Sequence, residues 1–95
     1  MSKESKFITT YAEDMEEQMS RKTKEIAVEA FNVNITKGKV YSTIALHIRQ
    51  ALDKTFGPGW NVVVGRNFGA LVTHKIKTYI YFTVVKDVYV LCWRS

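Results

Sequence analysis

The first part of the chain has the hydrophobic spacing of two amphipathic helices. Near-helical intervals separate a first set of apolar residues: Met15, Met19, Ile26, Ala27, Ala30 and Phe31. Asp14 and Glu17 form a candidate capping pair at the start of this helix. A second helix is predicted from about Tyr41 to Phe56, with one face formed by Ile44, Ala45, Ile48, Leu52 and Phe56. Gly57 and Pro58 are expected to end it, because glycine suits the C-terminal position and proline cannot continue a helix.

The remainder of the chain has the pattern of β-strands. Short segments separate β-branched and aromatic runs at residues 60–64, 68–74, 77–85 and 88–93. A further candidate strand, Lys6 to Tyr11, precedes the first helix, and residues 1–5 are expected to be disordered. Residues 1–95 are therefore predicted to form a single α+β domain in the order β-α-α-β-β-β-β. Its two helices would pack on one face of an antiparallel sheet.

The predicted sheet carries more apolar surface than two helices can cover. The segments "YIYF" (Tyr79 to Phe82) and "VYVLCW" (Val88 to Trp93) are apolar on both alternating faces. An uncovered apolar face usually binds a partner, and a second copy of the same chain is the simplest one. We therefore expect a homodimer.

Composition narrows the classes of function. The chain has 95 residues and a net charge of +5, and its excess of basic residues is scattered singly through the C-terminal half. Phosphate binding needs several cations acting together, so this distribution does not favour a nucleic-acid partner. No apolar run approaches the roughly 20 residues that span a bilayer. The N-terminal residues lack an apolar signal core, so we expect a cytosolic protein without a membrane partner.

The residues that could carry catalysis or bind a metal are few and far apart in the sequence. Cys92 is the single cysteine, and no Cys/His cluster has metal-ligand spacing, so neither a metal nor another cofactor is expected. No local pattern links His47, His74 and Cys92 as a nucleophile, a base and an orienting group. Structural roles are expected instead: a half-buried helix histidine, a strand-end histidine and a core thiol. The chain is predicted not to be an enzyme.

The stretch "GRNFGALVTH", Gly65 to His74, looks most like a site. It is not a phosphate-binding loop, because a strand rather than a helix follows its glycines and no lysine is in place. It partly matches the strand motif of RNA-recognition modules, but two of the three stacking aromatics are absent. A nucleic-acid-binding β-platform is therefore kept as the alternative function.

The same stretch also has the features of a strand edge that pairs with another chain. Gly69 would let a second backbone approach closely. No lysine or proline, the residues that usually block such pairing, occurs between Asn67 and Thr73. These residues alone leave an ordinary interior strand equally open.

A resemblance separates the two possibilities. "GPGWNVVVGRNFGALVTHKIKTYIYF" closely resembles the eight-kilodalton dynein light chains, and the similarity extends through "ALHIRQALDKTFGP" and, more loosely, "AEDMEEQM". It implies a non-enzymatic homodimer whose subunits exchange the strand matching Phe68 to Thr73. Short extended peptides, often with a Thr-Gln-Thr core, would add to the edge of that strand. The other wall of this peptide groove would be the second helix of the other subunit.

The resemblance also implies partners, a location and site residues. The partners are the dynein intermediate chain and disordered segments with Thr-Gln-Thr-like motifs, in the cytoplasm on the microtubule-associated dynein complex, or in the axoneme. The implied peptide-binding residues are Arg66, Asn67, Phe68, Gly69, Ala70, Leu71, Val72, Thr73, His74, Tyr81, Tyr41 and Ser42. The implied dimer-interface residues are Trp60, Asn61, Val63, Gly65, Phe68 and Val72.

Several positions depart from the family pattern. Tyr41 and Ser42 stand where the family often has a Glu-Lys pair that caps the motif glutamine. Ala70 and Leu71 replace a serine and a tyrosine on the pairing strand, and Thr83 replaces a tyrosine of the groove floor. We expect a groove that is more apolar than in the family and less demanding of glutamine.

Asn61 stands where the family commonly carries an interface histidine whose protonation separates the subunits in acid. Asparagine does not titrate, so the dimer is expected to persist at mildly acid pH. Analytical ultracentrifugation across this pH range tests the expectation. A monomer near pH ~5, below the ordinary histidine pKa, would contradict it.

Overall fold

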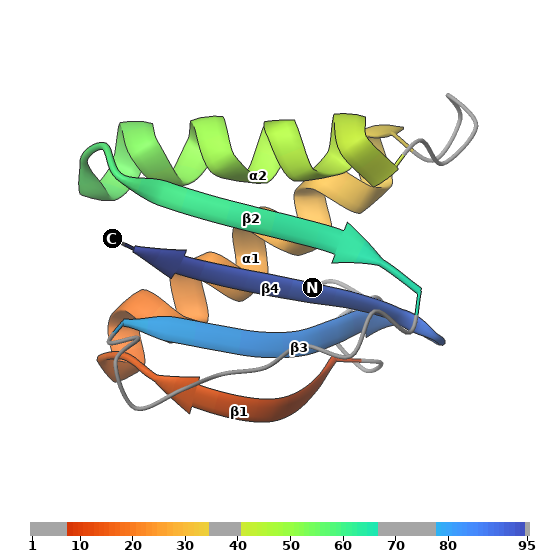
Figure 1. Ribbon diagram of the computed structural model, residues 1–95, viewed down its shortest axis with the longest axis horizontal. Helices are drawn as coiled ribbons and strands as arrows, with labels where there is room; N and C mark the ends of the chain where they lie inside the picture. Colours follow the sequence, from red (N-terminus) through yellow and green to blue (C-terminus); the bar gives the residue numbers. More distant parts are fainter. Residues whose placement is uncertain (1–7, 35–40, 67–77, 95) are drawn as a thin grey trace.

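The computed structural model describes residues 8–34, 41–66 and 78–94, which form two helices and a four-stranded antiparallel sheet (Figure 1). In chain order the elements are β1 (Thr9–Asp14), α1 (Glu17–Asn34), α2 (Tyr41–Phe56), β2 (Trp60–Gly65), β3 (Tyr79–Val85) and β4 (Val88–Arg94). The predicted α+β architecture is confirmed, and the bounds of α2 are those expected from the sequence. The strand predicted at residues 68–74 and the disorder predicted for residues 1–5 lie outside the described residues.

The strands lie in the order β1-β3-β4-β2 across the sheet. β3 and β4 form a hairpin whose turn, Lys86 and Asp87, is closed by the pair Val85 and Val88. Asp87 has a φ of 65°, a left-handed conformation that aspartate tolerates better than most residues. β1 and β2 are far from this hairpin in the sequence, and each pairs with one of its outer sides.

The start of the domain differs from the prediction. The first strand was expected at Lys6 to Tyr11, but β1 is Thr9–Asp14, and it extends as far as the pair between Asp14 and Tyr79 of β3. The prediction that Asp14 and Glu17 cap the first helix is wrong, because Asp14 is the last residue of β1 and α1 begins only at Glu17. The Ser20 backbone N–H donates to the Glu16 carbonyl at 2.8 Å. The end of β1 is decided by its pairing with β3, some 65 residues away in the sequence, so the local sequence does not reveal it.

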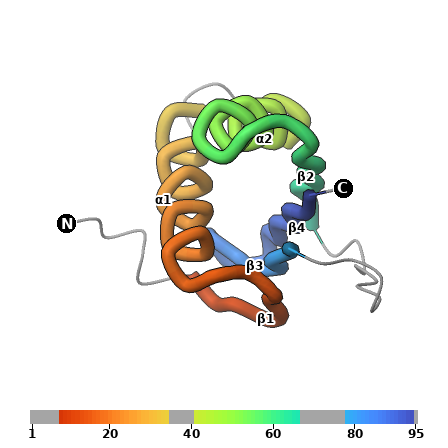
Figure 2. Tube along the Cα trace, turned by 90° about the vertical axis from the view of Figure 1, so that its left-hand side faces the viewer, coloured from red at the N-terminus to blue at the C-terminus, as the bar shows by residue number. Residues whose placement is uncertain are grey.

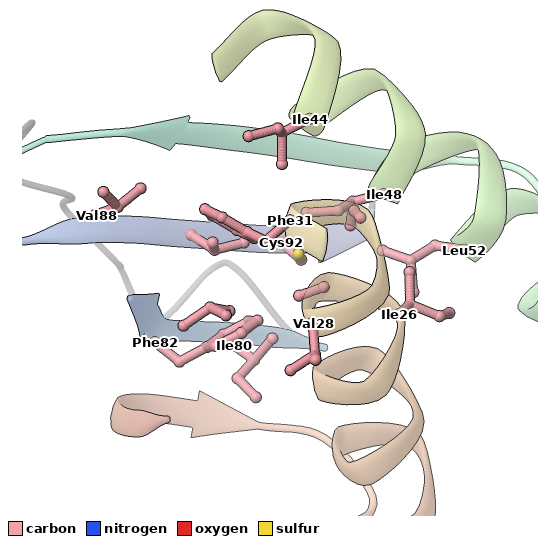
Figure 3. Close-up of a cluster of buried hydrophobic side chains, with 14 of the residues drawn as sticks. Ile26, Val28, Phe31, Ile44, Ile48, Leu52, Ile80, Phe82, Val88 and Cys92 are labelled. Atoms are coloured by element: carbon pink, nitrogen blue, oxygen red, sulfur yellow. The ribbon is translucent and has the colours of Figure 1, made fainter. Parts of the chain in front are cut away.

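Both helices cover the same face of the sheet (Figure 2). The core between them is apolar, and Figure 3 shows the side chains of both helices and of the central strands meeting there. The fully buried members with the largest volumes include Phe82, Ile44, Ile48, Leu52 and Ile80. Thr23 of α1 is also fully buried, and its hydroxyl donates to the Met19 carbonyl at 2.8 Å. The polar group is therefore satisfied within its own helix.

The turn from α2 into β2 is held by the end of β4. The Gly57 N–H donates to the Asp53 carbonyl at 2.9 Å, and Gly57 has a φ of 98°, as expected of a C-terminal glycine. The Arg94 guanidinium donates to the carbonyls of Phe56, at 2.8 Å, and Pro58, at 3.3 Å. It also lies over the Trp60 ring, 5.7 Å from the ring centroid. Arg94 thus satisfies the Phe56 carbonyl, which α2 leaves unpaired at its end, and the Pro58 carbonyl of the following turn.

Replacing Gly57 by alanine is expected to lower the free energy of unfolding by about 1–2 kcal/mol, because a side chain is strained at positive φ. The new Cβ would also lie 2.8 Å from the Arg94 Nη2 and displace the guanidinium. Urea denaturation measures the loss. Gly57→Asn is the matched comparison and is expected to lose less, since asparagine enters left-handed conformations more readily. An unchanged unfolding midpoint for Gly57→Ala would contradict this account of the turn.

Candidate functional site

The sheet has an outer face, turned away from the helices, which consists of three cross-strand rows. Strand register and the alternation of side chains place Asn61, Trp93, Tyr79 and Asp14 in one row. The second row is Val63, Leu91, Tyr81 and Ala12, and the third is Gly65, Tyr89, Thr83 and Thr9. No helix of the described residues lies over these rows, and Val63 is 38% exposed. The face is mainly apolar and aromatic, as the sequence predicted for a face in need of a partner.

Three tyrosines from three strands form a cluster on the outer face. Tyr81 and Tyr89 stack with ring centroids 5.6 Å apart and an interplanar angle of 22°. Tyr11 lies at the irregularity in β1 and is tilted against both, 5.9 Å from Tyr81 and 5.7 Å from Tyr89. The charge of Tyr11 raises the pKa of Tyr89 above its ordinary value, and desolvation, Tyr81 and Asp87 add to the effect.

Two members of this cluster escaped the sequence analysis. Tyr81 was expected in the groove floor, whereas Tyr11 and Tyr89 were not selected. Tyr89 pairs directly with Thr83 on the neighbouring strand, so it brings an aromatic ring beside the position where the family resemblance noted a lost tyrosine. Only the register between β3 and β4 reveals this, because Thr83 and Tyr89 lie on either side of a turn.

The structure brings together some of the expected interface residues and separates others. Asn61, Val63 and Gly65 share the outer face of β2. Trp60 lies on the helix-covered face, is 3% exposed and packs against Phe56 with ring centroids 6.1 Å apart. The expected sites from Asn67 to His74, including Phe68 and Val72 of the interface set, lie outside the described residues.

The remaining expected peptide-binding residues are distributed over two sides of the sheet. Arg66 is exposed directly after β2. Tyr41 and Ser42 begin α2, where Tyr41 packs against the core and Ser42 is exposed. Tyr81 faces the opposite way, on the outer face. Within one chain the sheet therefore separates Tyr81 from the start of α2.

The surroundings of His47 and Cys92 favour structural roles for both side chains. His47 is half-buried on α2, and its Nδ1 lies 3.4 Å from the Asn34 amide nitrogen. Cys92 is fully buried in the core, and this burial raises the pKa of its thiol far above the ordinary range. A thiol held neutral in this way is a poor nucleophile. The described residues hold no group of three or more His, Cys, Asp or Glu that could bind a metal ion, and none of their helices is long and apolar enough to cross a membrane.

Comparison with solved structures defines the class of the fold. The dynein light chain-like domain of the Fasciola hepatica calcium binding protein FhCaBP2 matches all of this chain and 95% of that domain, with a TM-score of 0.80 at 18% identity. The dynein light chain-like domain of CsTAL3 matches all of this chain and 96% of its own length, with a TM-score of 0.64 at 17% identity. The fold is thus that of a dynein light chain-like domain.

Comparison with known sequences identifies the family of the chain. The family model for dynein light chain type 1 matches residues 8–95. The cytoplasmic dynein light chain of Emericella nidulans is 42% identical over 69 residues, which cover 73% of this chain and 69% of that protein. The chain belongs to the dynein light chain family.

Proposed function

We propose that this dynein light chain is a non-catalytic homodimer that binds short linear motifs of other proteins by β-strand addition. The observation that carries the proposal is the outer face, an aromatic and apolar sheet surface that none of the described helices covers. Membership of the dynein light chain family supports the same conclusion. A second copy would bury this face through its own identical rows.

The separation of the site residues across the sheet also supports a dimer. Tyr81 and the start of α2 lie on opposite sides of the sheet in one chain, so a groove that uses both needs surfaces from two chains. An exchanged strand at Phe68 to Thr73 would supply the edge for the incoming peptide. Main-chain hydrogen bonds along that edge would then provide affinity, and pockets for alternate side chains would provide selectivity.

The proposed role is to hold two copies of a partner chain together. A dimer presents two equivalent grooves, and once one motif binds, the second binds at a high effective concentration. The proposed partners are the dynein intermediate chain and other proteins with Thr-Gln-Thr-like motifs in disordered segments. The location is the cytoplasm, with the dynein complex on microtubules, in keeping with the Emericella nidulans relative that is named cytoplasmic.

The tyrosine cluster bears on which peptides the groove prefers. Thr83 reduces the aromatic surface of the predicted floor, but Tyr89 stacks on Tyr81 beside it. The sheet therefore keeps aromatic rings beside Thr83. This supports a groove that gains affinity from apolar peptide side chains and depends less on the motif glutamine.

Calorimetric titration with a Thr-Gln-Thr peptide tests the function. We expect saturation at a ratio of about one peptide per chain, as β-strand addition to one edge requires. A Thr-Ala-Thr variant should lose less than tenfold in affinity, about 1.4 kcal/mol, if glutamine is only a minor determinant. A scrambled peptide is the control. The absence of peptide binding by the folded protein would contradict the proposal, and steeply salt-dependent binding of nucleic acid would support the β-platform alternative.

A further inference from the structure

A groove runs along α1 on the helix side of the molecule, away from the outer face. It has a volume of about 670 Å³ and is lined by one stripe of α1 from Glu17 to Asn32, together with Glu13 of β1 and Ile8 directly before that strand. With a rise of 1.5 Å per residue, the stripe is about 22 Å long. Val28, 8% exposed, and the half-buried Ile8 supply apolar contacts in it. These two residues, which also pack in or against the core, form a short apolar base in an otherwise polar groove.

The groove is acidic although the chain is basic. Four glutamates, at positions 13, 17, 25 and 29, line it with one arginine and one lysine, for a net charge of −2 in a chain of +5. The two cations are engaged, Arg21 with Glu17 at 3.2 Å and Lys24 with Glu13 at 3.9 Å. Towards the other end, no ion pair within the described part of the chain reaches Glu29. Glu25 pairs with Lys22 at 3.9 Å, so the uncompensated negative charge at this end is that of Glu29, beside Val28.

This charge decides what can bind. Nucleic acids and acidic lipid surfaces carry phosphates, which the glutamates repel. A segment with lysine or arginine is attracted by the local negative charge of the groove. The lining residues recur every three or four positions along α1. A row of side chains with this spacing is the surface on which a second helix packs.

We propose that this groove docks a cationic amphipathic helix of a partner protein. Its apolar face lies on Val28 and Ile8, and its lysines or arginines face Glu29 and compete with Lys22 for Glu25, in the helix-in-groove mode of peptide recognition. The site is separate from the proposed strand-pairing groove, since α1 covers the opposite face of the sheet (Figure 2). One dynein light chain thereby contacts two partner segments of different chemistry.

The test uses a synthetic amphipathic helix with leucines on one face and lysines on its flanks, titrated into the full-length, isotope-labelled chain. We expect amide shifts along α1 around Val28 and none around Tyr81. A saturating Thr-Gln-Thr peptide should leave the affinity for the Leu/Lys helix unchanged. The same helix with glutamates in place of lysines should not bind. If the Thr-Gln-Thr peptide fails to bind while the Leu/Lys helix binds, the proposed function fails and the present proposal stands.

A pair of charge reversals separates docking from a general effect of net charge. Glu29→Lys, in the groove, is expected to weaken binding about three- to tenfold, since it replaces attraction by repulsion at an exposed position. Glu16→Lys makes the same change at an exposed residue that does not line the groove and should weaken binding less than about twofold. Equal weakening by both variants, shifts centred on the outer face, or no binding by the unchanged chain would each overturn the proposal.

Discussion

Replacing Val63 by lysine is expected to convert the proposed dimer into a monomer. Val63 is 38% exposed in a single chain, pairs with Leu91 and lies in the middle row of the outer face. In a dimer that buries this face, the new ammonium would be desolvated without an anion beside it. This costs several kcal/mol, so association should weaken by more than about 100-fold. Sedimentation equilibrium should then give a mass of 10.9 kDa in place of twice that value.

A control for this experiment is available on the other side of the molecule. Leu46 of α2 is 44% exposed, so Leu46→Lys makes a similar change outside the outer face. It should remain dimeric. Val63→Lys should also lose the Thr-Gln-Thr peptide, because the proposed groove takes its walls from two subunits. A Val63→Lys protein that stays dimeric would show that the subunits associate through another surface.

Phe82→Ala is expected to cause the largest loss of stability. Phe82 is fully buried on the helix-covered face of β3 and pairs with Val90 of β4 and Thr10 of β1, so it lies at the centre of the sheet. Removing a buried phenylalanine ring typically costs about 3–5 kcal/mol, from lost burial and from the cavity that remains. Since small domains are stable by about 5–15 kcal/mol in total, part of the population should unfold under mild conditions.

Urea denaturation at a fixed protein concentration measures this effect, because the stability of a dimer depends on concentration. Leu46→Ala removes a similar volume from an exposed helix position and should change the free energy of unfolding by no more than about 0.5 kcal/mol. A loss below about 1 kcal/mol for Phe82→Ala would mean that the two layers do not pack around this ring as described.

The sequence predicted the helices and the hairpin well because their signals are local. The bounds of α2 follow from an apolar stripe that ends at a glycine and a proline. The turn between β3 and β4 follows from a short polar interruption between two apolar runs. Buried Ser20 and Thr23 of α1 were missed, because polar residues give no hydrophobic signal and their burial depends on local hydrogen bonds.

Features that depend on pairing between distant strands could not be predicted in this way. The bounds of β1 are set by its register with β3, and the tyrosine cluster exists because three strands from both ends of the chain lie side by side. The acidic groove depends likewise on the packing of α1 beside Ile8. A concave surface among the acidic residues of α1 leaves no pattern in the sequence.

The strand order has a consequence for the synthesis of the chain. β1 pairs only with β3 among the described strands, and β2 only with β4, so β1 has no partner until β3 has been made and β2 has none until β4 has been made. We therefore expect the nascent chain to pass through a stage in which the sheet-facing apolar sides of α1 and α2 are exposed to solvent. Long-range pairing of this kind folds slowly and is vulnerable to aggregation. We expect chaperones that recognise exposed apolar helices to bind the nascent chain during this interval, and to be released once the β3–β4 hairpin forms.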